Sequence, residues 1–411
     1  MPSVRESPRI LYCSDTYPPQ VNGVSVVTAV SVAGMQERGW ECAVVAPKYP
    51  KPYGKAFASD APGLAAVRMH VRLPSTAFPP YPDIRLVSPL YARVARAVRD
   101  FRPHLIHCQT EFLVGRLGQV AGARQGIPLV SSYHTDFSRY TEAYRIGWLR
   151  GWVTSYIKRF HNRSKRVYTP SEPARADLAR MGVPAEHIEV WGRSVDVKQF
   201  HPNMWSGALR EQIGVDDEFV FLHVGRLAPE KNVELLLDAY QLFRRRNPDF
   251  RSVLVVAGDG PAAPQLRARA GEGQGVTFLG NMDRRIVLPL LYASSDVFLY
   301  SSETETLGLV ILEAMASGIP VVATPAGGVA ENLRDGENGL AFPAGDAPAM
   351  AAAMERIAKD QALRHQLAKG AREWAESKSW SAELDRLDAS YKEVVELGSS
   401  PHASFVMRQH A

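Results

Sequence analysis

Two glutamates, Glu305 and Glu313, are separated by seven residues where the sequence predicts a strand, a loop and then a helix. The strand is predicted to end at Tyr300 and the helix to begin near Leu307. Glu305 then precedes the helix, and Glu313 lies about two turns inside it. Carboxylates in these positions cannot chelate one ion, but they can accept hydrogen bonds from two separate sets of hydroxyl groups. On its own, the pattern also fits a first-turn acid followed by a solvated glutamate.

The start of the same helix offers a site for an anion. Backbone N–H groups in the first turn of a helix have no partner within it, and the helix dipole is positive there. The groups concerned are those of Leu307, Gly308 and Leu309. A phosphate group is the ligand that such a helix start favours.

A second cluster places two cations at a turn. Arg226 and Lys231 follow a predicted strand at 219–224 and precede a predicted helix at 233–244. Open α/β sheets bind ligands at the edge where their strands end. Arginine supplies a planar fork of donors and lysine a point charge, and this pair suits a diphosphate. In isolation, a surface turn with two solvated bases would have the same sequence.

The first half of the chain has loops of the same kind. Gly23 lies near the start of a predicted helix, where a missing side chain lets a phosphate or sugar approach the backbone. The surrounding sequence is not G-x-G-x-x-G, which argues against a dinucleotide site. His134 follows a predicted strand at 128–132 and so faces the same edge of its sheet. A lone histidine is more often structural, so both interpretations of His134 stay open.

The elements that must position these residues follow a regular plan. Short apolar runs alternate with stretches of helical period, the pattern of parallel strands joined by helices. Strands are predicted at 9–14, 41–46, 65–70, 104–108, 128–132, 166–169, 187–190, 219–224, 252–257, 276–279, 297–300 and 320–323. Helices are predicted most clearly at 25–38, 84–101, 148–162 and 233–244. The fold class is therefore α/β, with two doubly wound units.

Domain boundaries follow from where the periodicity lapses. A polar stretch at 194–217 is predicted to be the linker, so the domains are 1–203 and 204–378. Residues 379–411 are predicted to form a helix that packs back on the first domain, followed by a frayed tail.

The composition is that of an ordinary globular protein. The chain has 411 residues, 45% of them apolar and 22% charged, which excludes disordered, collagen-like and coiled-coil proteins. Three cysteines without C-x-x-C spacing form neither a disulfide framework nor a zinc site, and they favour a reducing compartment. Neither a leader peptide nor a stretch of about 18 apolar residues is found, so we expect a cytoplasmic protein that does not span a membrane.

The net charge of +5 is concentrated in one segment. Residues 139–166 contain eight Arg or Lys and a single acid, Glu142, which gives this segment alone a charge of +7. Four aromatic residues recur there at every fourth position: Trp148, Trp152, Tyr156 and Phe160. Aromatic and basic residues on one helix suit the surface of an anionic membrane. The aromatic stripe could equally pack into the core while the bases are solvated.

Taken together, the motifs resemble the retaining glycosyltransferases of family 4, which have the GT-B fold of two Rossmann-like domains facing a central crevice. The resemblance covers nearly the whole chain, from about residue 10 to residue 391. It rests on five motifs in order: Gly225-Arg226 with Lys231, Gly258-Asp259-Gly260-Pro261, Phe278-Leu279-Gly280, Glu305-x(7)-Glu313, and the run at 314–320. It implies a hexosyltransferase that uses a nucleotide-sugar donor and retains the anomeric configuration.

The resemblance also implies roles for individual residues. Arg226 and Lys231 would hold the donor diphosphate, with Gly23 against its β-phosphate. Glu305 would bind hydroxyls of the donor sugar, and Glu313 those of the ribose. The catalytic set would be His134 (near the anomeric carbon), Arg226, Lys231 and Glu305. The donor-binding set would be Gly23, Gly225, Arg226, Lys231, Gly280, Asn281, Glu305, Thr306, Leu307, Gly308, Leu309 and Glu313. The acceptor side would be Asn22, Tyr133, Asp136 and Arg193. No D-x-D triplet occurs, so neither a metal site nor a cofactor is expected.

Two further segments narrow the resemblance. The closer resemblance is to the branch that contains GDP-mannose-dependent α-mannosyltransferases and the sulfoquinovosyl- and glucosyl-diacylglycerol synthases. It rests on residues 132–137 and 189–196, with Phe200-His201-Pro202. This favours GDP-mannose as donor and a lipid or glycolipid as acceptor, with a UDP-sugar (glucose or sulfoquinovose) as the alternative. Residues 139–166 would contact an anionic membrane on the inner face of the cell, and no nucleic acid partner is expected. A GT-B phosphorylase and a non-catalytic sugar-nucleotide binding module remain as weaker alternatives.

Overall fold

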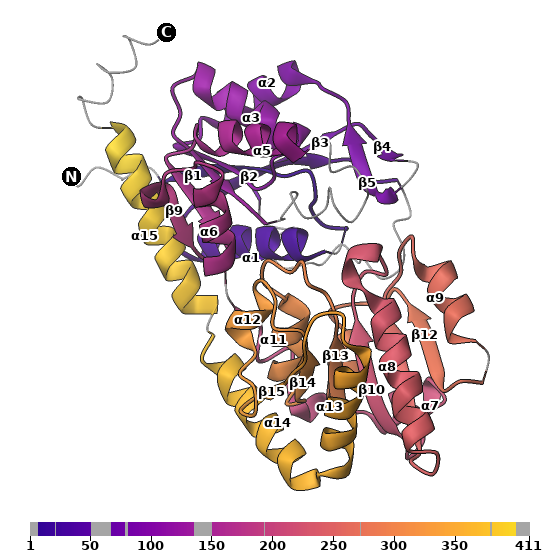
Figure 1. The fold of residues 1–411 in the computed structure, drawn as a ribbon. Coiled ribbons are helices and arrows are strands. Elements are labelled where there is room, and N and C mark those ends of the chain that lie inside the picture. The colour runs from indigo at the N-terminus through magenta and orange to yellow at the C-terminus, as the bar shows by residue number, and fades with distance from the viewer. Residues whose placement is uncertain are drawn as a thin grey trace. The chain divides into compact units, whose positions relative to one another are not determined.

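The computed structural model describes residues 7–20, 22–50, 67–78, 81–134, 150–192, 194–271, 273–378 and 380–399, which form two compact units. Unit 1 contains the described residues up to 134, together with 151–192 and 381–399, and unit 2 contains 194–380. The domain boundary expected at 203 falls inside unit 2. Each unit has its own parallel sheet with helices on both faces, so the predicted α/β class is confirmed (Figure 1).

Unit 1 is built on a seven-stranded parallel sheet in the order β3-β2-β1-β6-β7-β8-β9. The strands are β1 (Arg9–Cys13), β2 (Glu41–Pro47), β3 (Met69–Leu73), β6 (Leu105–Cys108), β7 (Leu129–Ser132), β8 (Arg166–Thr169) and β9 (Ile188–Val190). The helical elements before the last helix are α1 (Gly23–Glu37), α2 (Tyr91–Phe101), α3 (Leu113–Arg124), α5 (Arg150–His161), α6 (Glu172–Arg180) and η2 (Ala185–His187). The central strands are buried along almost their whole length, as expected of a parallel sheet covered on both faces.

The helix predicted at 84–101 is wrong in its first part. Residues up to Val87 belong to β5 (Tyr81–Val87), which pairs antiparallel with β4 (Ser75–Phe78). Apolar and polar residues alternate there, and Pro89 keeps Ser88 extended, so α2 begins only at Tyr91. The strand predicted at 65–70 also begins later, at Met69, and residues 65 and 66 lie outside the described residues.

The last helix, α15 (Trp380–Ser399), packs on unit 1 and is drawn in yellow in Figure 1. The indole N–H of Trp40 donates to Oδ1 of Asp388 at 2.7 Å, and Arg38 pairs with Asp385 at 2.7 Å. Tyr391 is fully buried on the inner face of the helix. The sheet of unit 1 is thus completed by a helix that lies more than 180 residues after its last strand.

Unit 2 is built on a six-stranded parallel sheet in the order β12-β11-β10-β13-β14-β15. The strands are β10 (Phe219–Val224), β11 (Ser252–Ala257), β12 (Val276–Gly280), β13 (Val297–Tyr300), β14 (Val321–Ala323) and β15 (Gly339–Ala341). The helices are α7 (Gly207–Gln212), α8 (Val233–Arg246), α9 (Ala263–Ala270), α10 (Val287–Ala293), α11 (Leu309–Ala316), α12 (Val329–Asn332), α13 (Ala347–Lys359) and α14 (Gln361–Glu376), with η3 (Pro202–Met204) and η4 (Pro229–Lys231). Successive residues of β10, such as Phe221 and Leu222, belong to separate hydrophobic clusters on the two faces.

The stretch at 194–217, expected to be a linker, is packed into unit 2. Its apolar residues lie in the hydrophobic cluster beneath α11: Val195, Phe200, Leu209 and Val215. Few apolar residues separated by polar ones are enough here, because they are buried in a cluster that strands and helices of unit 2 share.

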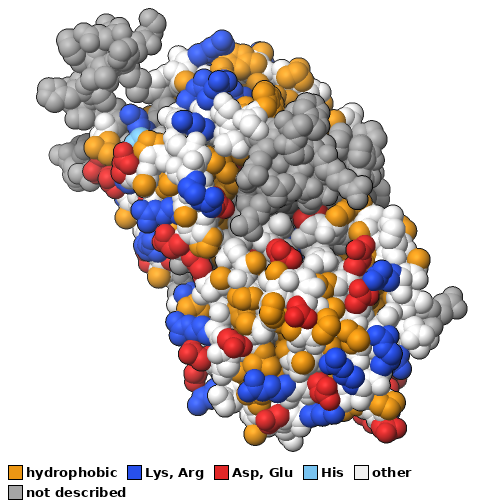
Figure 2. All heavy atoms as spheres, viewed as in Figure 1, with side chains coloured by type: hydrophobic (Ala, Val, Ile, Leu, Met, Phe, Trp, Pro, Cys, Tyr) orange, Lys and Arg blue, Asp and Glu red, His pale blue; other side chains and the backbone are white. Residues whose placement is uncertain are grey.

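In both sheets the chain order reverses once, between β1 and β6 in unit 1 and between β10 and β13 in unit 2. The loops that follow these four strands are 14–22, 109–112, 225–232 and 301–308. Reversal points at the carboxyl ends of strands are where open α/β sheets bind ligands. In Figure 2 acidic and basic side chains are interspersed over unit 2, whereas basic side chains predominate at the end of unit 1 where Figure 1 labels α2 and α3.

Candidate functional site

The reversal point of unit 2 brings Lys231 and Glu305 together. The ammonium group of Lys231 forms an ion pair with Oε1 of Glu305, and the hydroxyl of Tyr300 donates to the same oxygen. Both charged side chains are 14% exposed, so the pair is mostly shielded from water. The two residues are 74 positions apart in the chain and meet because β10 and β13 are neighbours in the sheet.

The electrostatics of this cluster keep Glu305 ionised. Burial raises the pKa of Glu305, but the ammonium of Lys231, with smaller contributions from Tyr300 and Arg226, outweighs burial and leaves the pKa below its usual value. Burial and the Glu305 carboxylate raise the pKa of Tyr300 well above its usual value, so its hydroxyl remains a donor. The sequence offered one signal for Tyr300, since it is the last residue of the predicted strand.

Arg226 lies in the same loop, where it pairs with the buried carboxylate of Glu230. The turn after β11 supports this loop from behind. A side chain at Gly258 would place its Cβ 1.8 Å from the carbonyl oxygen of Gly225, so the two backbones can approach only because position 258 is glycine. The segment at 258–261 is therefore a turn between β11 and α9, and it backs the loop at Gly225.

The helix predicted to begin near Leu307 begins two residues later. Gly308 is the N-cap residue with a φ of 73°, and α11 starts at Leu309. A left-handed residue at 308 turns the loop into the helix, which a non-glycine residue does only with strain. Among the described residues, the N–H groups of Leu307, Gly308 and Leu309 have no hydrogen-bond acceptor. The predicted anion site at this helix start therefore has its donors in place.

Glu313 is deeply buried, at 1% exposure, so the solvated alternative is wrong. Nε of Arg284 donates to its Oε1 at 2.8 Å, and the hydroxyl of Tyr292 donates to its Oε2 at 3.2 Å. The sequence indicated neither Arg284 nor Tyr292. The guanidinium of Arg284 also stacks on Phe200 at 5.3 Å, which fixes it over the carboxylate.

The remaining donor-side residues of unit 2 lie at the ends of strands and loops. Gly280 ends β12 with a φ of 71°, and Asn281 after it is exposed. Thr306 is partly buried beside Glu305. The backbone carbonyl of Glu305 accepts from the N–H of Gly328 at 2.8 Å, which ties the loop at 301–308 to the start of α12.

In unit 1, His134 is held by a buried hydrogen-bond network. Its Nε2 lies 3.0 Å from Oε1 of Gln109, and the amide nitrogen of Gln109 lies 3.3 Å from Nδ1 of His107. Nδ1 of His107 also contacts the hydroxyl of Tyr391 on α15 at 2.5 Å, and its Nε2 contacts Ser132 at 2.7 Å. Gln109, His107 and Tyr391 are all fully buried. The network thus connects the C-terminal helix to His134 through side chains that sequence analysis did not select.

The protonation states in this network follow from its donors and acceptors. An amide oxygen only accepts, so Nε2 of His134 carries its proton. Nδ1 of His107 accepts from an amide and a hydroxyl, so the proton of His107 is on Nε2. Burial, with a smaller contribution from His161, lowers the pKa of His134 to about 4, so its imidazole is neutral at pH 7.

The other predicted residues of unit 1 have separate positions. Asn22 is the N-cap of α1 and accepts from the N–H of Ser25 at 2.9 Å. Gly23 begins α1, and a side chain there would meet nothing within 4 Å, so the packing of the protein does not require glycine. Tyr133 is fully buried against His161. Asp136 and Arg193 lie outside the described residues.

The aromatic stripe on α5 is partly buried and partly exposed. Phe160 is buried in the core of unit 1, whereas Trp152 is 69% exposed and stacks on Tyr156 with ring centroids 5.9 Å apart. Trp148 and residues 139–149 lie outside the described residues. The core interpretation of the stripe is therefore confirmed for Phe160, and contact of Trp152 with a membrane stays a prediction. Among the described helices, none is long and apolar enough to cross a membrane.

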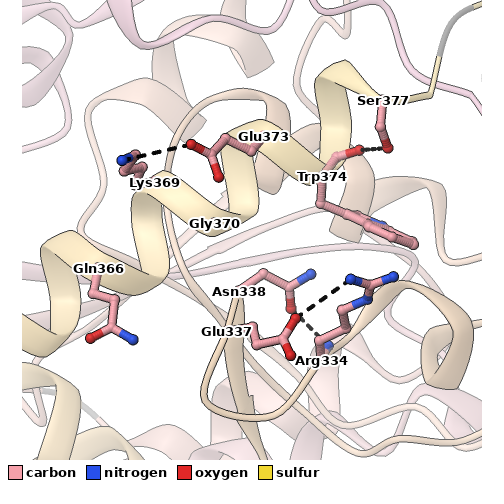
Figure 3. A pocket seen from close by; sticks show the side chains of 9 residues that line it. All are labelled: Arg334, Glu337, Asn338, Gln366, Lys369, Gly370, Glu373, Trp374 and Ser377. Carbon is pink, nitrogen blue, oxygen red and sulfur yellow. Dashed lines mark hydrogen bonds and ion pairs between the residues drawn. The ribbon is translucent and has the colours of Figure 1, made fainter.

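A cavity of about 580 Å³ in unit 2 contains none of the predicted site residues (Figure 3). Its walls are α14 and the loop after α12. Its charged groups are paired with one another, Arg334 with Glu337 at 3.5 Å and Lys369 with Glu373 at 3.8 Å. The ring of Trp374 is covered by Arg334 on the side of the loop, 4.2 Å from its centroid. This cavity is distinct from the cluster around Lys231 and Glu305.

Two family models match the chain, one described as Glycosyltransferase Family 4 over residues 21–199 and one as Glycosyl transferases group 1 over residues 207–374. A GDP-mannose-dependent alpha-mannosyltransferase of Mycobacterium tuberculosis is 31% identical over 387 residues, which are 94% of this chain and 97% of that protein. A sulfoquinovosyl transferase of Arabidopsis thaliana is 32% identical over 316 residues, which are 75% of this chain and 60% of that protein. The alpha-monoglucosyldiacylglycerol synthase of Acholeplasma laidlawii is 26% identical over 351 residues, 81% of this chain and 84% of that protein.

Solved structures show the same fold. Sucrose-phosphate synthase from Thermosynechococcus elongatus matches with a TM-score of 0.76 and 22% identity, over 95% of this chain and 100% of that chain. The Anabaena protein HepE in complex with UDP and glucose matches with a TM-score of 0.75 and 22% identity, over 94% and 99% of the two chains. Both likenesses support the GT-B architecture of two Rossmann-like units. With the near full-length similarity to a mannosyltransferase and the two family models, they lead to one conclusion: the chain belongs to glycosyltransferase family 4.

Proposed function

We propose that this glycosyltransferase moves mannose from GDP-mannose to a hydroxyl group of a lipid or glycolipid acceptor, with retention of configuration. The observation that carries the proposal is the pairing of Lys231 with Glu305 beside the start of α11. It combines a cation and unpartnered N–H groups for a diphosphate with a carboxylate for sugar hydroxyls. The near full-length similarity to the mycobacterial mannosyltransferase supports mannose and the guanine nucleotide.

In this proposal the residues of unit 2 stabilise the leaving group. As the bond between sugar and phosphate breaks, negative charge grows on the diphosphate. Lys231 and Arg226, with the N–H groups of Leu307, Gly308 and Leu309, interact more strongly with that charge than with the bound donor, which lowers the barrier. The N–H groups have no acceptor among the described residues, which supports their proposed role in binding the leaving phosphate.

Glu305 and Glu313 would orient the donor at its two ends. The ionised carboxylate of Glu305 can accept from hydroxyls of the sugar once the phosphate shares the charge of Lys231. Glu313 has about four acceptor positions on its two oxygens, and Arg284 and Tyr292 use three of them, which leaves about one for a ribose hydroxyl. The base would lie by Gly280 and Asn281.

Unit 1 would supply His134 near the anomeric carbon. A neutral imidazole with its proton held on Nε2 can orient a sugar hydroxyl without adding positive charge next to a carbon that becomes cationic. The departing phosphate would take the proton of the acceptor hydroxyl on the same face of the sugar, so no protein nucleophile is assigned. Gly23, with open space around its Cα, would allow close approach of the phosphate.

A UDP-sugar-dependent synthase of glycosyl-diacylglycerol is the second candidate. It is supported by the similarity to the Arabidopsis sulfoquinovosyl transferase and the Acholeplasma glucosyl-diacylglycerol synthase. Both candidates would use a lipid or glycolipid acceptor, so both predict catalysis at the inner face of the cell membrane. Neither is expected to need a metal ion.

Thermal stability in the presence of nucleotides tests the donor. A nucleotide that binds only the folded state raises the free energy of unfolding by mass action, by about 2.7 kcal/mol at a hundred times its Kd. The Tm rises accordingly. We expect GDP to raise Tm more than UDP or ADP at equal concentration, and GDP-mannose to be consumed equally with and without EDTA. A larger response to UDP would refute GDP-mannose in favour of the second candidate, and loss of turnover in EDTA would refute metal independence.

A further inference from the structure

A pocket of about 210 Å³ lies between α3 and α5 of unit 1, apart from His134 and the loop of Gly23. Three arginines line it, Arg116 from α3, Arg159 from α5 and Arg163 from the turn that follows α5. Phe160 and Tyr156 form the rest of its lining. At about 30 Å³ for each water molecule in the liquid, the pocket has room for a polyatomic anion with its oxygens.

The positive charge of this pocket has no acidic partner among the residues that the structure describes. Within the described part of the chain, no carboxylate forms an ion pair with Arg116, Arg159 or Arg163. Other arginines nearby in the chain do have such partners, for example Arg166, which pairs with Glu393 at 2.9 Å. Burial and then the charges of Arg116 and Arg159 lower the pKa of Arg163, as expected for guanidinium groups that face one another across the pocket.

Two acids whose charges act on Tyr156, a lining residue of the pocket, are engaged elsewhere. Oε1 of Glu111 lies 3.3 Å from Nε2 of His161, and the hydroxyl of Tyr156 donates to the backbone carbonyl of Glu111 rather than to its carboxylate. Asp15 accepts from the hydroxyl of Thr110 at 2.6 Å and from the N–H of Val114 at 2.9 Å. Among the described residues, neither acid neutralises the pocket, so an anion that binds there would relieve the repulsion.

We propose that Arg116, Arg159 and Arg163 form a binding site for a phosphate group. Guanidinium groups present paired N–H donors that match the oxygens of phosphate, and three of them can surround a tetrahedral anion from different sides. An aromatic wall beside these groups lowers the competition from water for the same oxygens.

The surroundings of the pocket indicate what carries the phosphate. Trp152 is 69% exposed and stacks on Tyr156, and Phe112, just before α3, is 53% exposed. Exposed aromatic side chains next to a cationic pocket suit an amphipathic molecule whose phosphate lies next to an apolar part. This assignment of the ligand rests on the proposed function. It adds to that function a site that binds the phosphate of the lipid headgroup or acceptor. A soluble phosphate compound carries the same phosphate group, and the experiment below distinguishes it from a lipid.

The test compares two double variants of the full chain that remove the same charge. R159A/R163A removes two arginines of the pocket, and R93A/R96A removes two exposed arginines of α2 in the same unit. Binding is measured by flotation with neutral phosphatidylcholine vesicles that contain either phosphatidic acid or oleic acid, an anionic lipid without phosphate. Glycerol 3-phosphate and inorganic phosphate are titrated in parallel.

We expect the wild-type protein to float with phosphatidic acid more than with oleic acid, and R159A/R163A to bind at least about tenfold more weakly, since each charge-assisted hydrogen bond contributes on the order of a factor of ten. R93A/R96A should stay within about twofold of the wild type. Equal losses in both double variants, or flotation that exceeds the neutral-lipid background equally with both anionic lipids, would overturn the proposal. Saturable binding of glycerol 3-phosphate without flotation would support the phosphate site and identify a soluble source.

The nucleotide response separates this proposal from the proposed function. If R159A/R163A loses phosphate binding and its Tm still rises with GDP, the variant is folded and only the pocket is lost. If the wild type binds phosphatidic acid but responds to no nucleotide, the phosphate site stands and the proposed transferase function fails.

Discussion

Nε2 of His134 lies 3.0 Å from Oε1 of Gln109, and this contact decides which nitrogen of the imidazole carries the proton. Gln109 is in turn fixed by His107 and, through it, by Tyr391 of α15. The orientation of a residue at the edge of the sheet thus depends on a helix at the end of the chain. Gln109 acts as a positioning residue for His134, and substituting it tests this relationship directly.

Replacing Gln109 by Leu removes the acceptor that holds Nε2–H of His134. We expect kcat to fall on the order of a hundredfold, since misplacement of a functional group by about 1 Å has that effect, while KM for the donor changes little. Gln109→Glu restores an acceptor and adds a charge, which raises the pKa of His134 from about 4. Its activity should fall as pH drops through that raised pKa. The check is the pH dependence of kcat/KM: identical acid limbs in wild type and Q109E would speak against the relationship.

Glu305→Gln removes the charge of Glu305 and keeps its volume and its contact with Tyr300. We expect transfer to fall by about 100- to 1000-fold, as for loss of one polar group aimed at the reacting centre, while the Tm response to nucleotide persists through Lys231. Glu303→Gln in the same loop is the matched control and should retain turnover. Initial rates of sugar transfer decide the matter, and wild-type turnover in E305Q would refute the proposed role.

Arg284→Met leaves the buried carboxylate of Glu313 without its cation. Breaking a buried pair costs about 3 kcal/mol or more, so Tm should drop markedly. Arg245→Met, at an exposed position of α8, should change stability by less than about 0.5 kcal/mol. Glu313→Gln should raise KM for the donor with little change in kcat, because a ribose contact is the same in ground and transition states. A pure kcat effect in E313Q would place Glu313 at the reaction instead.

Gly34→Ala tests the packing of α15 against α1. A Cβ at position 34 would lie 2.4 Å from Cδ1 of Leu384, so we expect a loss of about 1–3 kcal/mol. The double variant G34A/L384A should lose less than the sum of the two single losses, because the smaller side chain makes room for the added methyl group. Gly151→Ala on α5 meets nothing within 4 Å and serves as control. Additive losses, measured by thermal or denaturant unfolding, would contradict the contact.

The buried side chain of His223 should make the stability of the protein depend on pH. It is fully buried, its Nδ1 lies 3.1 Å from the carbonyl of Leu299, and burial lowers its pKa to about 4. The unfolded chain, with a pKa near 6.5, binds a proton between pH 6.5 and 4 that the folded protein does not. Stability is therefore complete above about pH 6.5 and is lost as pH falls toward 4, by about 1.4 kcal/mol per pH unit. His223→Asn should make the dependence of Tm on pH shallower between 7 and 5, whereas His365→Asn at an exposed position should leave it unchanged.

The sequence was most informative about the positions of strands and least informative about which side chains contact one another. Buried parallel strands are short apolar runs, so β10, β11 and β13 were located to the residue. The helix expected at 84–101 failed because an edge hairpin and a proline replace its first part. Lys231 and Glu305 could be selected from their motifs, but Tyr300 as their shared contact could not, because only the order of strands brings these side chains together.

The sequence by itself determined the fold class, the family and the residues at the carboxyl ends of the strands, because periodicity and motif spacing are properties of one segment at a time. The tertiary structure decided which charges are neutralised. Glu313 is buried against Arg284, 29 residues away, whereas Arg116 meets Arg159 and Arg163 in a pocket that no acid of the described residues lines. Such pairings depend on the neighbours that the sheet order and helix packing provide, and distance along the chain carries no information about them.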